Sequence, residues 1–95
     1  MALRTSDSII KVAIVDDHDA IRFAFKAACE GFGFEFVASA GSVTELLEKH
    51  PDIKCDVVVM DLSLADGSIV AENVTALLKT GAQVVIFSIA DKQNL

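Results

Sequence analysis

The chain has 95 residues, 53% of them apolar, and a formal net charge of −6. This apolar fraction argues against intrinsic disorder, and the length fits one small domain. The negative charge argues against direct nucleic-acid binding by this segment, because phosphate contacts need clustered Lys and Arg.

The ends and the cysteines of the chain give no sign of export. Residues 1–8 lack the apolar core of a signal peptide, and we interpret them as an N-terminal tail before a domain at 9–95. No apolar run approaches the ~20 residues that a membrane span needs. Cys29 and Cys55 match no metal or redox spacing, and we expect both to be buried and reduced. The chain is therefore expected to be cytoplasmic and to make no membrane contact.

Strand-like and helix-like patterns alternate along the chain. Short apolar or alternating runs predict strands at 9–15, 34–39, 55–61 and 83–88. Apolar residues at helical spacing predict helices between them, at 20–30, 42–49 and 68–80. Ser42 and Glu45 have capping-box spacing at the start of the second helix, and Gly81 is expected to end the third.

The helical periodicity also predicts which faces are buried. The apolar face of the first helix is expected to consist of Ile21, Ala24, Phe25, Ala28 and Cys29. The opposite, polar face of that helix consists of Arg22, Lys26 and Glu30. The apolar stripe of the third helix is expected to consist of Val70, Val74, Leu77 and Leu78.

Strict alternation of strands and helices with short loops predicts a doubly wound, flavodoxin-like α/β fold with a parallel sheet. The alternating run at 34–39 suits an edge strand, and the apolar runs at 9–15 and 55–61 suit the middle, which gives the strand order 2-1-3-4. Crossover handedness then places the first helix on one face and the other two on the opposite face. In this arrangement the fourth strand is apolar on both sides but has no outer neighbour, and nothing covers strands three and four on the face of the first helix. We therefore interpret the chain as a domain that lacks a fifth strand and a last helix.

Acidic residues stand where two neighbouring strands of this sheet end. Asp16 and Asp17 follow the first strand and Asp61 ends the third, so all three are expected at the topological switch point, where ligands bind in such folds. Two like charges about 4 Å apart repel by roughly 4 kcal/mol at an effective dielectric of ~20, which favours a bound cation. Carboxylate oxygens suit Mg²⁺ or Mn²⁺. Ser88 follows the fourth strand at the same edge, either to bond a phosphoryl oxygen or as an ordinary strand-end hydroxyl. We interpret His18 as a partly exposed residue at the start of a helix.

Three segments at these strand ends are similar to the motifs of a known family. They are Val15-Asp16-Asp17-His18, Val59-Met60-Asp61-Leu62-Ser63-Leu64 and Ile86-Phe87-Ser88. Together they resemble the receiver domains of two-component response regulators. Asp-Asp-His followed by Arg22 is similar to the branch whose members also have a helix-turn-helix DNA-binding domain.

This resemblance implies a signalling module rather than an enzyme. Asp61 would accept a phosphoryl group from a sensor histidine kinase and relay the signal to a transcriptional output domain outside this chain. Asp17, Asp61 and the backbone carbonyl of Ser63 would bind Mg²⁺, with Asp16 helping, partly through water. Ser88 would hydrogen-bond the phosphoryl group and act as the switch. The family's Lys at the end of the fifth strand has no counterpart here, and Ala65 stands where the family usually has Pro.

The same residues fit two other functions less well. A phosphatase of the haloacid-dehalogenase type needs a second Asp two residues after Asp61, where this chain has Ser63. A flavodoxin-like mononucleotide binder needs a phosphate loop after the first strand, where residues 16–19 would repel a phosphate. The alternative that stays open is a non-signalling fragment that self-associates, as a homodimer or a larger oligomer, through its exposed strand and first helix.

Overall fold

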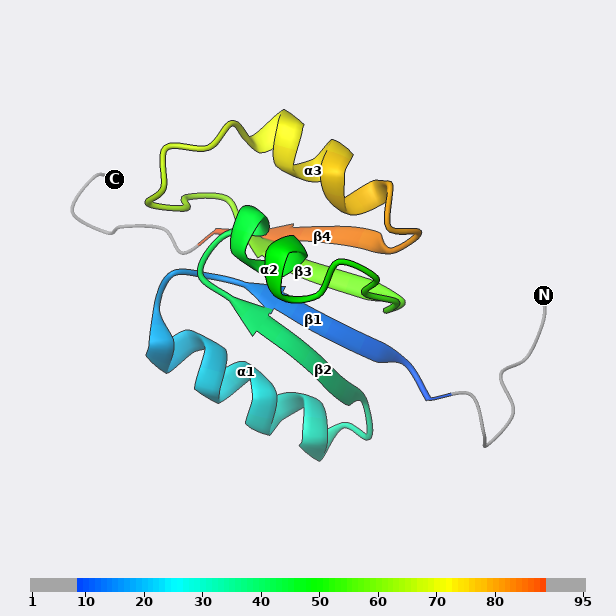
Figure 1. The fold of residues 1–95 in the computed structure, drawn as a ribbon. Helices are drawn as coiled ribbons and strands as arrows, with labels where there is room; N and C mark the ends of the chain where they lie inside the picture. The colour runs from blue at the N-terminus through cyan, green and yellow to red at the C-terminus, as the bar shows by residue number, and fades with distance from the viewer. Residues whose placement is uncertain (1–8, 89–95) are drawn as a thin grey trace.

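The structure is a computed structural model and describes residues 9–88. The strands are β1 (Lys11–Val15), β2 (Glu35–Ala40), β3 (Val57–Asp61) and β4 (Gln83–Phe87). The helices are α1 (Asp19–Gly31), α2 (Val43–Lys49) and α3 (Val70–Leu78), and they alternate with the strands along the chain (Figure 1). Every predicted element is present, and each predicted boundary falls within two residues of the observed one. The predicted tail at 1–8 and the end of the predicted domain at 89–95 lie outside the described residues.

The four strands form one parallel sheet in the order β2-β1-β3-β4, which confirms the predicted topology. The central strand β1 is buried from Val12 to Val15, in keeping with its unbroken apolar run. Because the strand order reverses between β1 and β3, the loops that follow these two strands leave the sheet on opposite sides and open a crevice at their carboxyl ends.

The helices lie on both faces of the sheet, with α1 on one face and α2 and α3 on the other (Figure 1). The main hydrophobic core lies between the sheet and the pair α2 and α3. Its buried members are Ala13, Val15, Ala38, Ala40, Val43, Leu46, Val58, Met60, Leu77 and Ala82. The start of α2 follows from its sequence, because the Ser42 hydroxyl accepts the Glu45 N–H at 3.0 Å, as the capping-box spacing predicts.

The face covered by α1 is closed over β1 and open over β3 and β4. Val12 and Ile14 of β1 are 4% and 0% exposed. Beside them an open apolar depression of about 380 Å³ is lined by Ile21, Ala24, Phe25, Val59 and Phe87. Val85 of β4 is 50% exposed. Within residues 9–88 this part of the sheet is therefore uncovered, as the sequence indicated.

Some predicted burials are wrong. Ala24 and Ala28 of α1 are exposed, and Ala24 lines the depression beside α1, which no element within residues 9–88 closes. Leu78 is 52% exposed, whereas the adjacent Leu77 is fully buried, because neighbouring helical residues point about 100° apart. Cys55 is half-buried at the amino end of the sheet, while Cys29 is buried as expected.

Among residues 9–88, no helix is long and apolar enough to cross a lipid bilayer.

Candidate functional site

The structure brings Asp16, Asp17 and Asp61 together at the crevice. Asp16 directly follows β1, and its N–H donates to the carbonyl oxygen of Ala40 in β2 at 3.0 Å. Asp61 is the last residue of β3, which pairs with β1. One possible ligand atom from each of Asp16, Asp17, His18 and Asp61 lies within 4.8 Å of the others. The ends of two adjacent parallel strands thus build one cluster of oxygen and nitrogen ligands.

Two carboxylate oxygens of this cluster are buried without a hydrogen bond. Among residues 9–88, Oδ2 of Asp16 and Oδ1 of Asp17 are shielded from solvent and accept no hydrogen bond, although Oδ1 of Asp17 lies 3.2 Å from Nδ1 of His18. A buried charged oxygen without a partner costs free energy unless a cation or a donor offsets it. The donor set and these buried oxygens fit a small hard cation such as Mg²⁺ or Mn²⁺.

His18 lies at the rim of the cluster and precedes the first turn of α1. Its N–H donates to Oδ1 of Asp16 at 2.7 Å, and its Nδ1 lies 2.9 Å from the same oxygen and 3.2 Å from Oδ1 of Asp17. The side chain is 63% exposed, as expected for a residue at a helix start. The hydrogen bond to Asp16 and the charges of Asp17 and Asp16 raise the pKa of His18. The contacts with Asp16 and Asp17 therefore favour the protonated form of His18.

The loop after β3 begins with two hydrogen bonds that fix Asp61. Oδ1 of Asp61 accepts the N–H of Ser63 at 3.0 Å, and the N–H of Leu62 donates to the carbonyl oxygen of Phe87 in β4 at 2.8 Å. Ser63 is exposed, and the group of Ser63 that contacts Asp61 is its N–H. Ser88 follows Phe87 at the same edge of the sheet, but its hydroxyl forms no hydrogen bond to Asp61. Ser88 is therefore near the site without being joined to it.

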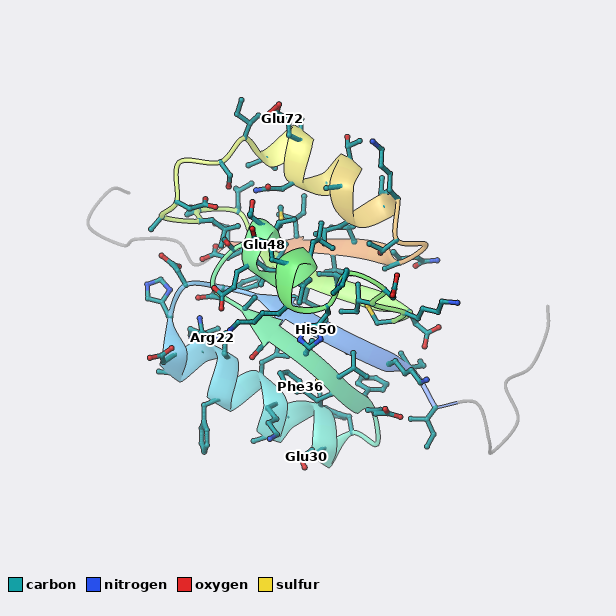
Figure 2. The ribbon with its side chains drawn as sticks, viewed as in Figure 1. Arg22, Glu30, Phe36, Glu48, His50 and Glu72 are labelled. Carbon is teal, nitrogen blue, oxygen red and sulfur yellow. The ribbon has the colours of Figure 1, made fainter. Side chains whose placement is uncertain are left out.

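Arg22 is a contact of this site that the sequence pattern assigned elsewhere. Helical periodicity places Arg22 on the polar face of α1, yet its guanidinium donates to the backbone carbonyl of Asp16 and to the carboxylate of Asp19. In Figure 2, Arg22 lies at the start of α1, beside the loop that enters from β1. The spacing of Asp19 and Arg22 at i and i+3 is the one sequence signal for part of this contact.

Residues 12–95 match the family described as the response regulator receiver domain. Over 57 residues the chain is 39% identical to the response regulator GacA of Pseudomonas syringae pv. syringae, a match that covers 59% of this chain and 27% of GacA. The chain thus spans about a quarter of the length of that relative.

Solved structures give the same fold. The receiver domain of PhyR from Erythrobacter litoralis superposes with a TM-score of 0.75 at 22% identity, covering 88% of this chain and 66% of that one. A LuxR-family two-component response regulator from Aurantimonas has a TM-score of 0.73 at 28% identity, covering 88% of this chain and 61% of that one. The isolated receiver domain of RcsB from Salmonella enterica, solved with the phosphomimetic BeF₃⁻, has a TM-score of 0.70 at 18% identity, covering 90% and 65%.

Proposed function

This chain belongs to the response regulator receiver domain family, and on that premise we propose that Asp61 accepts a phosphoryl group from a sensor histidine kinase. The observation that carries the proposal is the convergence of Asp16, Asp17 and Asp61, whose ligand atoms lie within 4.8 Å of one another at the carboxyl ends of β1 and β3. In the transfer, an Asp61 oxygen forms a bond to phosphorus while the phosphorus–nitrogen bond of a phosphohistidine breaks. The electron pair returns to the imidazole nitrogen, which takes up a proton.

The same cluster is proposed to hold Mg²⁺. Asp17, Asp61 and the backbone carbonyl of Ser63 would be its ligands, with Asp16 helping, partly through water. The buried Oδ2 of Asp16, which accepts no hydrogen bond within residues 9–88, supports this choice, because a cation offsets its charge. When bound, the cation supplies screening between the Asp61 carboxylate and an approaching phosphoryl group.

The protein's own groups orient Asp61 and respond to its modification. The Ser63 N–H bonds Oδ1 of Asp61, which restricts rotation of the carboxylate and leaves the second oxygen for the new bond. Ser88 would donate its hydroxyl to a phosphoryl oxygen and so act as the switch. The hydrogen bond between Leu62 and Phe87 supports this role, because it couples the loop after Asp61 to the end of β4.

We further infer a place for this segment in a longer signalling protein. Residues 9–95 would form the receiver domain after a tail at 1–8, and would act in the cytoplasm. GacA is a response regulator, a LuxR-family regulator shares the fold, and RcsB dimers have been solved on DNA. These relatives support relay to a helix-turn-helix transcriptional output domain. With a net charge of −6, this segment itself would not contact nucleic acid.

The decisive test is an amide NMR titration with Mg²⁺, followed by beryllofluoride, which mimics a phosphoryl group on Asp. We expect shifts at Asp17, Asp61 and Ser63 with Mg²⁺, and at Ser88 when beryllofluoride is added. Asp61→Asn should abolish the beryllofluoride response and keep a dispersed spectrum. Asp52→Asn removes an exposed carboxylate outside the cluster and should leave both responses intact. Dispersed wild-type peaks that neither reagent moves would refute the proposal.

The open apolar surface favours a second candidate, a non-signalling module that self-associates. Within residues 9–88 the outer edge of β4 pairs with no strand, and Val85 and Ile86 are 50% and 44% exposed. Phe23 on α1 is 78% exposed. An unpaired apolar edge strand is a template for pairing with a second copy. Sedimentation velocity over a range of concentrations should then reveal an oligomer unaffected by Asp61→Ala, whereas a monomer at every concentration removes this candidate.

A further inference from the structure

The acidic loop, defined here as residues 16–18 between β1 and α1, packs closely against the turn that joins β2 to α2. The Asp16 N–H donates to the carbonyl of Ala40, the last residue of β2, at 3.0 Å. A Cβ placed on Gly41 in the turn would lie 3.9 Å from the Cα of Asp17 and 3.7 Å from Nη1 of Arg22. The loop and the turn are therefore in contact through Gly41, with Arg22 beside both.

Arg22 contacts the acidic loop from the first turns of α1. One guanidinium nitrogen donates to the backbone carbonyl of Asp16, and the other donates to the carboxylate of Asp19. The Arg22 side chain is 22% exposed, so most of it is shielded from solvent. A planar guanidinium can serve two acceptors at fixed angles, which a lysine ammonium on its flexible stem cannot reproduce.

Glu45 fixes the β2–α2 turn through two hydrogen bonds. Its N–H donates to the Ser42 hydroxyl at 3.0 Å, and its Oε2 accepts the Gly41 N–H at 3.1 Å. A Cβ added to Gly41 would lie 3.3 Å from this Oε2 and 3.7 Å from Nη1 of Arg22. The guanidinium and the Glu45 carboxylate therefore both lie close to Gly41 in the turn.

From these contacts we propose that Arg22 is a positioning residue, which ties the acidic loop to the start of α1 beside the β2–α2 turn and so sets where the Asp16 and Asp17 carboxylates stand in the cation site. The role of that site as a cation site rests on the proposed function. By Coulomb's law alone, a guanidinium beside the cluster weakens binding of a cation. Positioning of the ligands strengthens it. The two effects have opposite signs, which makes them separable.

The first experiment measures Mn²⁺ affinity of the whole chain by electron paramagnetic resonance, for wild type, Arg22→Lys and Arg22→Gln. Positioning predicts that both variants bind Mn²⁺ about 10-fold more weakly or worse, the usual effect of losing a group that orients metal ligands. If Arg22 acts through charge alone, Arg22→Gln binds more tightly and Arg22→Lys is unchanged, and the proposal is overturned. Lys26→Gln removes a positive charge from an exposed position on the same helix and should leave the affinity within about twofold.

The second experiment needs no metal and separates this proposal from the proposed function. Amide hydrogen exchange is compared between wild type and Arg22→Lys at Asp16, His18 and Gly41, whose N–H groups bond Ala40, Asp16 and Glu45. Positioning predicts faster exchange at these amides, with exchange at the buried Val58 and the melting temperature unchanged. If wild type fails to bind Mn²⁺ while Arg22→Lys loosens the loop, the cation site fails and the positioning role stands. Unchanged exchange at all three amides overturns the positioning role.

Discussion

The two faces of the sheet have similar apolar side chains but differ in how completely they are covered. On the face beneath α2 and α3, called the sealed face below, Leu46, Val58, Met60 and Leu77 are all 0% exposed, although Ile86 at the end of β4, opposite Met60, is 44% exposed. On the α1 face, burial is complete over β1, yet Val85 on β4 is 50% exposed. The difference therefore comes from the position of the helices and not from the residues of the strands.

This difference divides the functional site into two parts. Asp16 and Asp61 are 0% and 7% exposed and follow buried strand residues, so their positions are fixed by the packed part of the molecule. Ser88 follows β4, the strand with the most exposed side chains. Local unfolding of an element with few buried contacts costs less free energy than unfolding of a packed core. Asp16 and Asp61 are thus held by the packed part of the molecule, whereas the proposed switch residue follows the least covered strand.

The largest expected effect is the loss of stability when a buried side chain of the sealed face is truncated. Leu46→Ala removes a fully buried side chain of α2 from the core and should lower the free energy of unfolding by about 2–5 kcal/mol. Urea denaturation followed by circular dichroism measures this. Leu78→Ala, at a 52% exposed position of α3, is the matched control and should cost less than about 1 kcal/mol. Equal costs would mean that α2 and α3 do not seal this face as described.

A second pair of variants compares the faces with one substitution. Val58→Thr puts a hydroxyl into the sealed core, where it finds no partner, and should cost about 1–3 kcal/mol. Val85→Thr makes the same change at the half-exposed position on the open face, and should fall within about 0.5 kcal/mol of wild type. The same denaturation assay serves both. A large loss in Val85→Thr would indicate that β4 is covered in solution.

The third prediction concerns the cap that fixes α2 over the sealed face. Ser42→Ala removes the hydroxyl that accepts the Glu45 N–H and should lower the free energy of unfolding by about 1 kcal/mol. Ser42→Thr keeps a hydroxyl and should recover most of that stability. If Thr is as damaging as Ala, the loss arises from packing at this position and the cap contributes little.

The fold was predictable from the sequence because its signals are local and periodic. Strand ends at residues 15 and 61 sufficed to place Asp16 and Asp61 side by side once the strand order was known. Arg22 was not predictable, because helical periodicity describes where a side chain leaves the helix and not where its long stem folds back. Whether the Ser88 hydroxyl bonds Asp61 depends on the path of β4, which no motif specifies.

The smallest expected effect is a pH dependence at the junction between the sealed face and the acidic loop. The hydrogen bond from Lys49, the Gly41 N–H and the charges of Lys49 and Arg22 hold the pKa of Glu45 below its ordinary value of 4.5. A lowered folded-state pKa means that ionised Glu45 stabilises the fold above pH 4.5, and that this contribution is lost as the pH falls through the folded-state pKa.

Thermal melts of wild type and Glu45→Gln between about pH 6 and pH 3 should therefore differ most at the upper end and converge on acidification. Glu48→Gln removes an exposed carboxylate from the same helix (Figure 2) and should show a small difference from wild type that does not change in this way. If the melting temperature converges with that of wild type for Glu45→Gln and not for Glu48→Gln, the stability of the turn depends on the contacts of Glu45 with Gly41 and Lys49. If the difference in melting temperature between wild type and Glu45→Gln instead grew as the pH falls, the contacts with Gly41 and Lys49 would not be its cause.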